Sequence, residues 1–355
     1  MKSIIHEKII KNGPLSFADY MAMALYEPNR GYYARGEMQV GRRGDFYTSV
    51  SVGPVFGLLL AHYFLEQWQM LGEPSKWRIT EYGAHDGKLA LDVLNALGAL
   101  NMTAYTAVEY VIPDPLENLR AAQTVTLADH ITKVSQITTS SQLTPKPGVI
   151  FGNEVLDALP CQLIEMTNDG WQECRVTREG ETLVWQLVPI TESKLLAATH
   201  QLGNAFPMGY RTEIRCDYEK FLEPIHDSLS EGRMLWIDYG FERPDYYHPD
   251  RREGTLRAFS HHQAGADVLS HPGEVDISAH VDFTAVAEAC RDLGGHPHSL
   301  ISQGNWLTHQ AKDWLLAQEG NPDPKAMRQF QTLTHPGHLG RAFQILEVDF
   351  GPRNQ

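Results

Sequence analysis

The chain has 355 residues, 42% of them hydrophobic and 21% charged, which suits a globular protein with a sizeable core. Its formal net charge of −14 argues against non-specific binding to nucleic acid or to an anionic membrane, because both would repel an acidic surface. The four cysteines show no CxxC spacing, and no stretch has the pattern of a secretory signal or a membrane span. We therefore expect a cytoplasmic protein that binds neither nucleic acid nor membrane.

Residues 1–75 are expected to form an N-terminal helical cap with a lid segment. Ser16 is placed to cap a helix over residues 17–26. Further on, GRRGDFYTSVSVGPVFG carries closely spaced glycines, and its Thr48 and Ser49 can cap the helix that follows. This stretch is either a lid over a ligand or a helix entry with a solvated basic turn, and the sequence leaves both open.

Residues 76–160 alternate between strand and helix patterns, which predicts the first half of a parallel sheet with crossover helices. In residues 161–212 short alternating runs are joined by the turn signals at 168–170 and 179–180, so we expect an inserted antiparallel meander. Residues 213–355 return to the α/β pattern as the second half of the core, with a polar insertion at about 242–281. The expected strands of the core are 77–83, 103–110, 148–154, 232–241, 296–303 and 341–350.

The first candidate site is the loop in ITEYGAHDGKLALDVL, which leads from a strand into a helix. Glu81, Gly83 and Gly87 surround it, and ligands of open α/β sheets bind at such strand ends. A dinucleotide requires G-x-G-x-x-G, which is absent, so S-adenosylmethionine fits the spacing better. Glu109, expected to end the next strand, can accept both ribose hydroxyls. The alternative is a plain turn without a ligand.

The second candidate site is FGNEVLDALP, where Asn153, Glu154 and Asp157 follow a strand directly. These polar groups face the same crevice as the glycine loop, and they can hold a nitrogen or oxygen nucleophile beside a methyl sulfonium. Methyl transfer depends mostly on the positions of its two reactants, and carboxylates orient a guanidinium well. The alternative is that Asn153 and Asp157 merely cap the following helix.

Several stretches, in order over nearly the whole chain, resemble one family. They are YEPNRGYYARG, GRRGDFYTSVSVGPVFG, EYGAHDGKLALDVL, GNEVLDALP, WIDYG, GTLRAFSHHQAGADVLSHPGEVDISAHVDFTAV and HPGHLGRAFQILEV. The family is that of the MidA-type class I S-adenosylmethionine-dependent methyltransferases, also called the mitochondrial complex I assembly factor 7 family. The resemblance implies a Rossmann-like α/β sheet of seven strands, the last antiparallel, with a helical cap and an inserted meander.

The resemblance also implies roles for individual residues. S-adenosylmethionine would be bound by Glu81, Gly83, His85 and Gly87, its ribose by Glu109, and its methionyl end by Gly44, Asp45, Thr48 and Ser49. Asn153, Glu154 and Asp157 would face the cofactor and the methyl acceptor, which for the mitochondrial members is a protein arginine. The polar insertion would form the substrate mouth, with Arg257, Asp276, His280 and Asp282 as contacts.

Two departures from the family pattern concern the cofactor. His85 stands where the family has glycine, and histidine tolerates a left-handed backbone better than most other residues. We therefore expect His85 to narrow the cofactor site without abolishing it. VEYVIPDPLENL replaces a shorter turn, so the adenosine pocket is expected to be remodelled around Tyr110 and Pro113. The histidines of the insertion lack the spacing of metal ligands, and no metal is expected.

The leading hypothesis is methylation of a nitrogen nucleophile such as a protein arginine. One alternative is a small-molecule O- or N-methyltransferase, which a closed aromatic pocket would favour over a wide acidic groove. Another is a non-catalytic assembly or binding protein that retains the fold, and His85 is the feature that supports it. A dehydrogenase is disfavoured by the glycine spacing. The sequence leaves the oligomeric state open, with a homodimer as one candidate.

Overall fold

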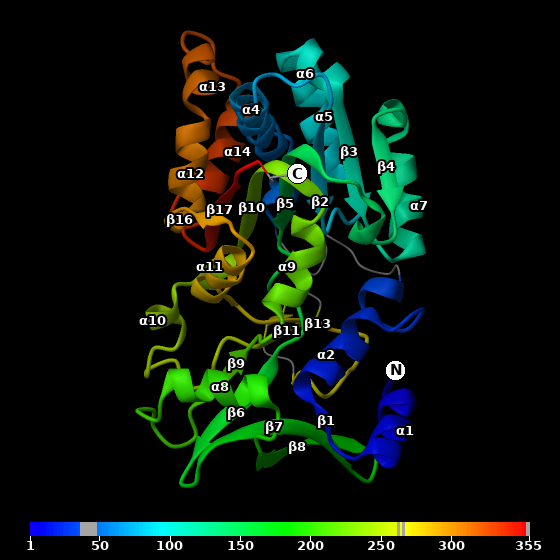
Figure 1. Ribbon diagram of the computed structural model, residues 1–355, viewed down its shortest axis with the longest axis vertical. Helices are drawn as coiled ribbons and strands as arrows, with labels where there is room; N and C mark the ends of the chain where they lie inside the picture. The colour runs from blue at the N-terminus through cyan, green and yellow to red at the C-terminus, as the bar shows by residue number, and fades with distance from the viewer. Residues whose placement is uncertain (36–47, 261–262, 265–266, 353–355) are drawn as a thin grey trace.

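The six residues Trp77–Tyr82 are all buried, as in a strand covered on both faces, and they form β2 near the centre of a large sheet. The computed structural model describes residues 1–35, 48–260, 263–264 and 267–352 of the chain. The large sheet and its helices occupy the upper part of Figure 1, and a second layer built on a smaller sheet lies below. Within the described residues, no helix is long and apolar enough to cross a membrane.

The strands of the large sheet are β2, β3 (Val108–Pro113), β4 (Val134–Ile137), β5 (Lys146–Asn153), β10 (Leu229–Phe241), β14 (Val281–Asp282), β15 (His296–Pro297), β16 (Ile301–Ser302) and β17 (Phe343–Phe350). Their order is β15–β17–β10–β5–β2–β3–β4, with β16 also paired to β17 and β14 to β10. The strands from β4 to β10 run parallel, whereas β17 runs antiparallel to β10. This confirms the expected Rossmann-like α/β sheet with a final antiparallel strand.

Helices cover both faces of this sheet (Figure 1). They are α4 (Val55–Met70), α5 (Lys88–Leu100), α6 (Met102–Ala107), α7 (Glu117–Thr126), α9 (Tyr218–His226), α11 (Phe283–Asp292), α12 (Gln303–Gln310), α13 (Lys312–Ala317) and α14 (Pro324–Thr334). The buried side chains of α4, α5 and α12 form one apolar core with the sheet. Those of α9 and α11 form a second core on the opposite face. The sheet is therefore a rigid platform whose strand ends can position a site.

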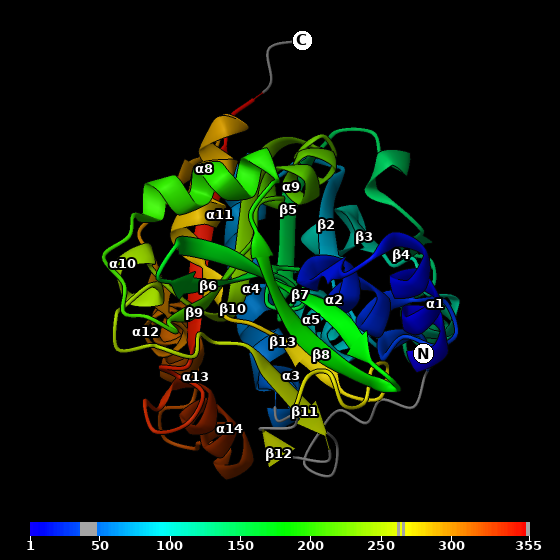
Figure 2. The ribbon, with the colours of Figure 1, turned by 90° about the horizontal axis from the view of Figure 1, so that it is seen from below.

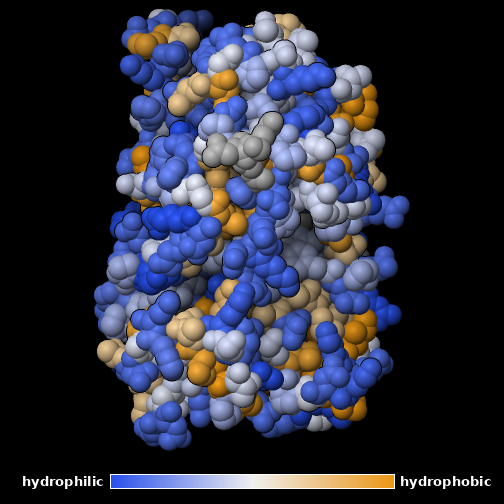
Figure 3. Space-filling view, viewed as in Figure 1, coloured by the Kyte–Doolittle hydropathy of each residue, from blue (hydrophilic) through white to orange (hydrophobic). Residues whose placement is uncertain are grey.

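The lower layer combines the N-terminal cap with the inserted meander. Its elements are α1 (Lys2–Asn12), β1 (Leu15–Ser16), α2 (Phe17–Tyr26), β6 (Gln162–Thr167), β7 (Gly170–Glu179), β8 (Thr182–Pro189), α8 (Ser193–Leu202) and β9 (Arg211–Ile214). β1 pairs with β7, and α2 shares an apolar core with β6 and β7, so two segments far apart in sequence form one layer (Figure 2). The expected meander is present, while the division of the chain at 75, 160 and 212 stays a prediction. On the face shown in Figure 3, polar side chains dominate and the surface is hollowed at mid-height.

The strand expected at 103–110 is wrong in its position. Asn101 caps α6 by accepting hydrogen bonds from the backbone N–H groups of Thr103 and Ala104, so residues 102–107 are helical and β3 begins only at Val108. Thr103 and Thr106 had favoured a strand, but the cap determines the local structure. The strand expected at 296–303 is likewise reduced to the short pieces β15 and β16, because Pro297 has no N–H to donate.

Candidate active site

The carboxyl ends of β2 and β5 form the point at which the strand order of the sheet reverses. The chain passes from β2 to its neighbour β3 on one side and reaches β5 on the other side later. Glu81 pairs with Phe151 and Tyr82 with Gly152, so the loops after the two strands leave the sheet side by side. Open α/β sheets bind ligands at such a point. The glycine loop and the Asn153–Asp157 segment (the acceptor loop) therefore lie side by side at the carboxyl ends of β2 and β5.

The glycine loop, residues 83–87, turns through three left-handed residues. The φ angles are 72° at Gly83, 49° at His85 and 82° at Gly87. His85 therefore has the conformation that the family pattern assigns to glycine, at the energetic cost of a side chain in this region. Gln123 Nε2 donates to the carbonyl of His85 at 2.9 Å, and Gly87 leads directly into α5. Gln123 of α7 thus holds the loop on one side, and Gly83 lies against Val155 of the acceptor loop on the other.

Glu81 lies at the base of this loop, inside the sheet. Its side chain is 2% exposed, and the Tyr110 hydroxyl donates to Glu81 Oε2 at 2.5 Å. Burial raises the pKa of Glu81 to about 8, although the hydrogen bond from Tyr110 opposes that shift. The carboxyl group is consequently held in one orientation by its neighbour on β3.

Glu109 does not end its strand, which corrects the sequence prediction. It is the second residue of β3, at the amino end, where Arg78 Nε and Lys146 Nζ lie 3.1 and 2.6 Å from Glu109 Oε2. The error follows from the misplaced strand, because the carboxyl end of β3 comes several residues later. Glu109 therefore lies near the amino end of β3, whereas the glycine loop lies at the carboxyl end of the neighbouring strand β2.

The acid that follows β3 is Asp114, which the sequence reasoning missed. Its side chain is buried, and Asp114 Oδ2 accepts a hydrogen bond at 3.0 Å from the same Gln123 Nε2 that binds the His85 carbonyl. Burial raises the pKa of Asp114, against the opposing effects of its hydrogen bonds. An aspartate directly after Pro113 was a visible signal, but it required the right strand boundary.

The acceptor loop is held in an unusual shape by Asp238, another residue that the sequence reasoning missed. Glu154 has a φ of 56°, a left-handed conformation that is rare outside glycine. Asp238 Oδ2 on β10 accepts hydrogen bonds from the backbone N–H groups of Val155, Leu156 and Asp157 at 3.1, 2.8 and 3.1 Å. Asp238 lies in the WIDYG stretch, but nothing in that stretch shows that its carboxyl group binds the acceptor loop.

The acceptor loop brings two acidic side chains close together. Burial raises the pKa of Glu154 to about 8, and the neighbouring Asp157 adds to the shift. Burial raises the pKa of Asp157 to about 6, while Arg215 opposes it. Asn153 Nδ2 donates to Glu154 Oε1 at 3.0 Å, whereas the buried Asn153 Oδ1 has no hydrogen-bond partner in the described chain. An unpaired buried acceptor beside two carboxyl groups suits a cationic or hydrogen-donating ligand.

Aromatic residues of the cap cover the same edge. The Tyr33 hydroxyl donates to Asp276 Oδ1 at 2.9 Å, and the Tyr26 hydroxyl donates to the carbonyl of Ala158 at 2.9 Å. The two rings stack with centroids 5.5 Å apart. Asn118 on α7 donates to the carbonyl of Tyr33. The YEPNRGYYARG stretch therefore reaches Ala158, directly after the acceptor loop, and it contacts Asp276, whose role as a substrate contact stays a prediction.

The other residues expected at the substrate mouth have different surroundings. Asp282 caps α11 and forms an ion pair with Arg243 at 3.2 Å, which is a structural role. Arg257 is exposed. His280 packs against the rings of Tyr239 and Phe241, and burial together with nearby arginines lowers its pKa to about 4. Within the described residues, none of these three side chains forms a hydrogen bond or an ion pair with a side chain of the acceptor loop.

The expected lid residues are only partly described. Thr48 caps the short helix α3 (Ser49–Val52), and Ser49 Oγ donates to Gln303 Oε1 at 3.0 Å inside the core. Gly44 and Asp45 lie outside the described residues. Among the residues that the structure describes, no group of three or more histidine, cysteine or acidic side chains is arranged to bind a metal.

Comparison with known proteins identifies this architecture. Residues 59–301 match the family model Methyltransf_28, which describes S-adenosyl-L-methionine-dependent methyltransferases. The chain belongs to this family. It is therefore an S-adenosylmethionine-dependent methyltransferase of the MidA type, as the resemblance implied.

Relatives of this methyltransferase cover nearly its full length. A Burkholderia thailandensis protein of the COG1565 superfamily, solved with S-adenosyl-homocysteine bound, is 31% identical with a TM-score of 0.88, over 99% of this chain and 92% of that one. The mitochondrial protein arginine methyltransferase NDUFAF7 of Danio rerio is 28% identical, over 96% of this chain and 85% of the relative. The Homo sapiens protein of the same name is 26% identical, over 96% and 81%.

The expectation of a cytoplasmic protein is contradicted by the NDUFAF7 relatives, which are named as mitochondrial proteins. The physical reason for the error is that net charge and cysteine spacing reflect the solvent to which a folded protein is adapted, and they do not identify the compartment. A mitochondrial matrix and a cytoplasm impose similar requirements on a surface.

Proposed function

We propose that this methyltransferase transfers a methyl group from S-adenosylmethionine to a guanidinium nitrogen of a protein arginine. The observation that carries the proposal is the group of acceptors in the acceptor loop, formed by Asn153 Oδ1 and the carboxyl groups of Glu154 and Asp157. Val155 of the same loop lies against Gly83. A guanidinium has five N–H donors and no acceptor, so it complements this group. The names of the relatives, protein arginine methyltransferases, support the same acceptor.

The cofactor would bind at the glycine loop, next to the acceptor loop at the carboxyl ends of β2 and β5. Gly83, His85 and Gly87 would approach the cofactor with their main chain, and Glu81 would lie beneath them. Asp114 replaces Glu109 as the acid for the ribose hydroxyls, because Asp114 shares Gln123 with the glycine loop. Gly44, Asp45, Thr48 and Ser49 remain predicted contacts of the methionyl end.

The acceptor side of the proposal assigns orientation and proton transfer. When bound, the cofactor supplies an electrophilic methyl carbon on a sulfonium. The acceptor nitrogen gains the methyl group and loses one proton, and Glu154 takes that proton while Asn153 and Asp157 orient the guanidinium. In its ionised form, a carboxyl group with a pKa of about 8 is a stronger base than one with the ordinary value, so Glu154 suits this role once it has lost its own proton.

The test has a binding arm and a transfer arm. Calorimetric titration with S-adenosylhomocysteine measures the cofactor site; an absence of heat at millimolar ligand would contradict the proposal. The enzyme is then incubated with methyl-labelled S-adenosylmethionine and the soluble protein of a host that lacks this chain. Labelled methylarginine after hydrolysis supports the proposal. Label confined to metabolites, to lysine or to carboxyl groups would refute the arginine acceptor, and Glu154→Gln should remove the protein-bound label.

A further inference from the structure

Arg215 has an unusual set of partners. It follows β9 at the end of the meander, and within the part of the chain that the structure describes its guanidinium donates hydrogen bonds to four main-chain carbonyls. The acceptors are Asp157 O at 2.6 Å, Leu159 O at 2.9 Å, Ala279 O at 2.9 Å and His280 O at 2.7 Å. Within the described chain, no carboxylate lies within ion-pair distance of it. Arginine is normally paired with acids when it is partly buried, so this arrangement requires an explanation.

The carbonyls that Arg215 binds belong to two segments. Asp157 and Leu159 are part of the acceptor loop and its continuation, and Ala279 and His280 precede β14. The segments also bond directly, since the Ala279 N–H donates to the carbonyl of Asp157 at 3.1 Å. Asp238 binds the N–H groups of the acceptor loop, so Arg215 and Asp238 hold opposite sides of its backbone. One acidic and one basic side chain therefore fix the backbone of a loop that contains a left-handed glutamate.

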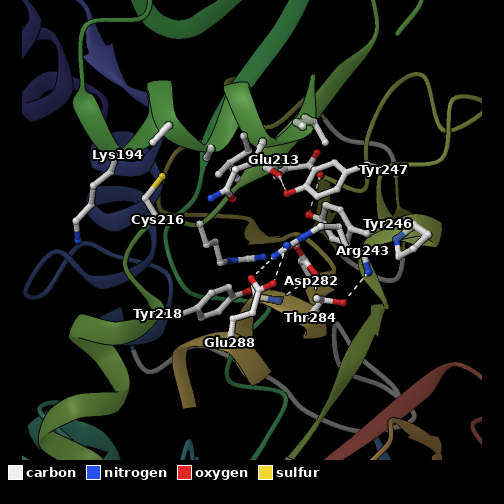
Figure 4. A pocket seen from close by; sticks show the side chains of 18 of the residues that line it. Lys194, Glu213, Cys216, Tyr218, Arg243, Tyr246, Tyr247, Asp282, Thr284 and Glu288 are labelled. Atoms are coloured by element: carbon white, nitrogen blue, oxygen red, sulfur yellow. Dashed lines mark hydrogen bonds and ion pairs between the residues drawn. The ribbon is translucent and has the colours of Figure 1, made fainter. Parts of the chain in front are cut away.

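A cavity of about 770 Å³ lies beside Arg215, between α8 of the meander and the helices α9 and α11. The other cations that line it are paired: Arg243 contacts Asp282 and Glu288 (Figure 4), and Lys194 Nζ lies 3.4 Å from Asp217 Oδ1. The buried Tyr218 hydroxyl also lines the cavity, without a hydrogen bond of good geometry. Arg215 could therefore bind solvent or an acid on this side, yet its guanidinium is directed to the acceptor loop.

We propose that Arg215 is a positioning residue for methyl transfer, which binds the backbone of the acceptor loop and thereby fixes Glu154 and Asp157 relative to the methyl donor. The inference rests on the proposed function, because it assigns the acceptor loop to the methyl acceptor. Arg215 touches neither reactant. Misplacement of a reacting group by about 1 Å can reduce a rate by about 100-fold, so a residue in this position has a large effect on turnover.

The test compares Arg215→Met and Arg215→Lys with the matched control Arg243→Met. The control removes a cation from the same cavity without touching the acceptor loop. Hydrogen exchange of residues 154–159 should be about 10-fold faster in Arg215→Met, with Arg215→Lys between it and wild type, because lysine keeps the charge but reaches fewer carbonyls. The control should exchange like wild type at this loop.

Activity separates a positioning role from a structural one. In Arg215→Met, kcat for labelled methyl transfer should fall about 100-fold, while the affinity for S-adenosylhomocysteine stays within about threefold of wild type. Lysine should restore part of kcat. Wild-type exchange and kcat in a folded Arg215→Met or Arg215→Lys protein would overturn the inference. An inactive wild type would instead contradict the proposed function, and the exchange data would still decide whether Arg215 fixes the loop.

Discussion

Gly83 and Val155 are in close contact across the reversal point of the sheet, since a Cβ added at Gly83 would lie 2.6 Å from Val155 Cγ2. The glycine loop and the acceptor loop therefore support each other directly. A side chain at position 83 would push the two loops apart. Two features therefore favour glycine at this position. Its φ angle is left-handed, and Val155 occupies the space that a Cβ atom would need.

We expect Gly83→Ala to weaken binding of S-adenosylhomocysteine by at least about 10-fold and to destabilise the fold by about 1–3 kcal/mol. Calorimetry and thermal unfolding measure the two effects. Gly180→Ala is the control, because Gly180 also has a positive φ of 59° but a Cβ there would meet nothing within 4 Å. The control should lose a little stability and no affinity. Normal affinity in Gly83→Ala would show that the two loops do not form the cofactor site.

We expect Asp114→Asn to weaken binding of S-adenosylhomocysteine by about 10-fold, because an amide replaces one of two carboxylate acceptors for the ribose hydroxyls. Glu109→Gln should leave the affinity unchanged, since Glu109 pairs with Arg78 and Lys146 at the other edge of the sheet. Titration of both variants distinguishes the two acids. The reverse result would restore Glu109 as the ribose contact.

We expect His85→Gly to increase the affinity for S-adenosylhomocysteine by about threefold or more, because glycine removes a side chain from a loop that already has the glycine conformation. Stability should change by less than about 1 kcal/mol, since relief of strain is offset by the flexibility of the unfolded chain. Glu73→Gly, at a φ of 56° outside the site, controls for the backbone effect. Weaker binding in His85→Gly would mean that the imidazole contacts the cofactor.

We expect Glu154→Gln to stabilise the protein at pH 8 and to have little effect at pH 5. The folded state keeps Glu154 protonated up to about pH 8, whereas the unfolded state ionises from about pH 4.5. The folded state therefore binds more protons between these values, and its stability falls as the pH rises through them. The gain at pH 8 should be about 2 kcal/mol, reduced from the full shift because the side chain is partly exposed.

Urea unfolding at both pH values checks this prediction. Glu179→Gln, at the exposed end of β7, should follow the wild-type pH dependence. A Glu154→Gln protein that is less stable than wild type at pH 8 would show that the native fold stabilises Glu154 as an anion, which would contradict the raised pKa of its carboxyl group.

The local pattern of the chain was sufficient for much of the architecture. The alternation of strand and helix patterns predicted the parallel strands, and the turn signals at 168–170 and 179–180 predicted the hairpins of the meander. The spacing of the glycines favoured S-adenosylmethionine over a dinucleotide as the cofactor. His85 was recognised as a residue in a glycine position, and its φ of 49° agrees with that interpretation. These features depend on residues close in sequence, whose sterics act locally.

The tertiary structure alone decided which acid follows β3 and which residues hold the acceptor loop. Glu109 and Asp114 are close in sequence, but the capped helix α6 delays the start of β3, so the two acids lie at opposite ends of that strand. Asp238 and Arg215 bind a loop that is many residues away, through contacts with the backbone that carry no signature in sequence. Propensity and spacing act within a few residues, whereas strand register and long-range hydrogen bonds are fixed only when distant segments pack together.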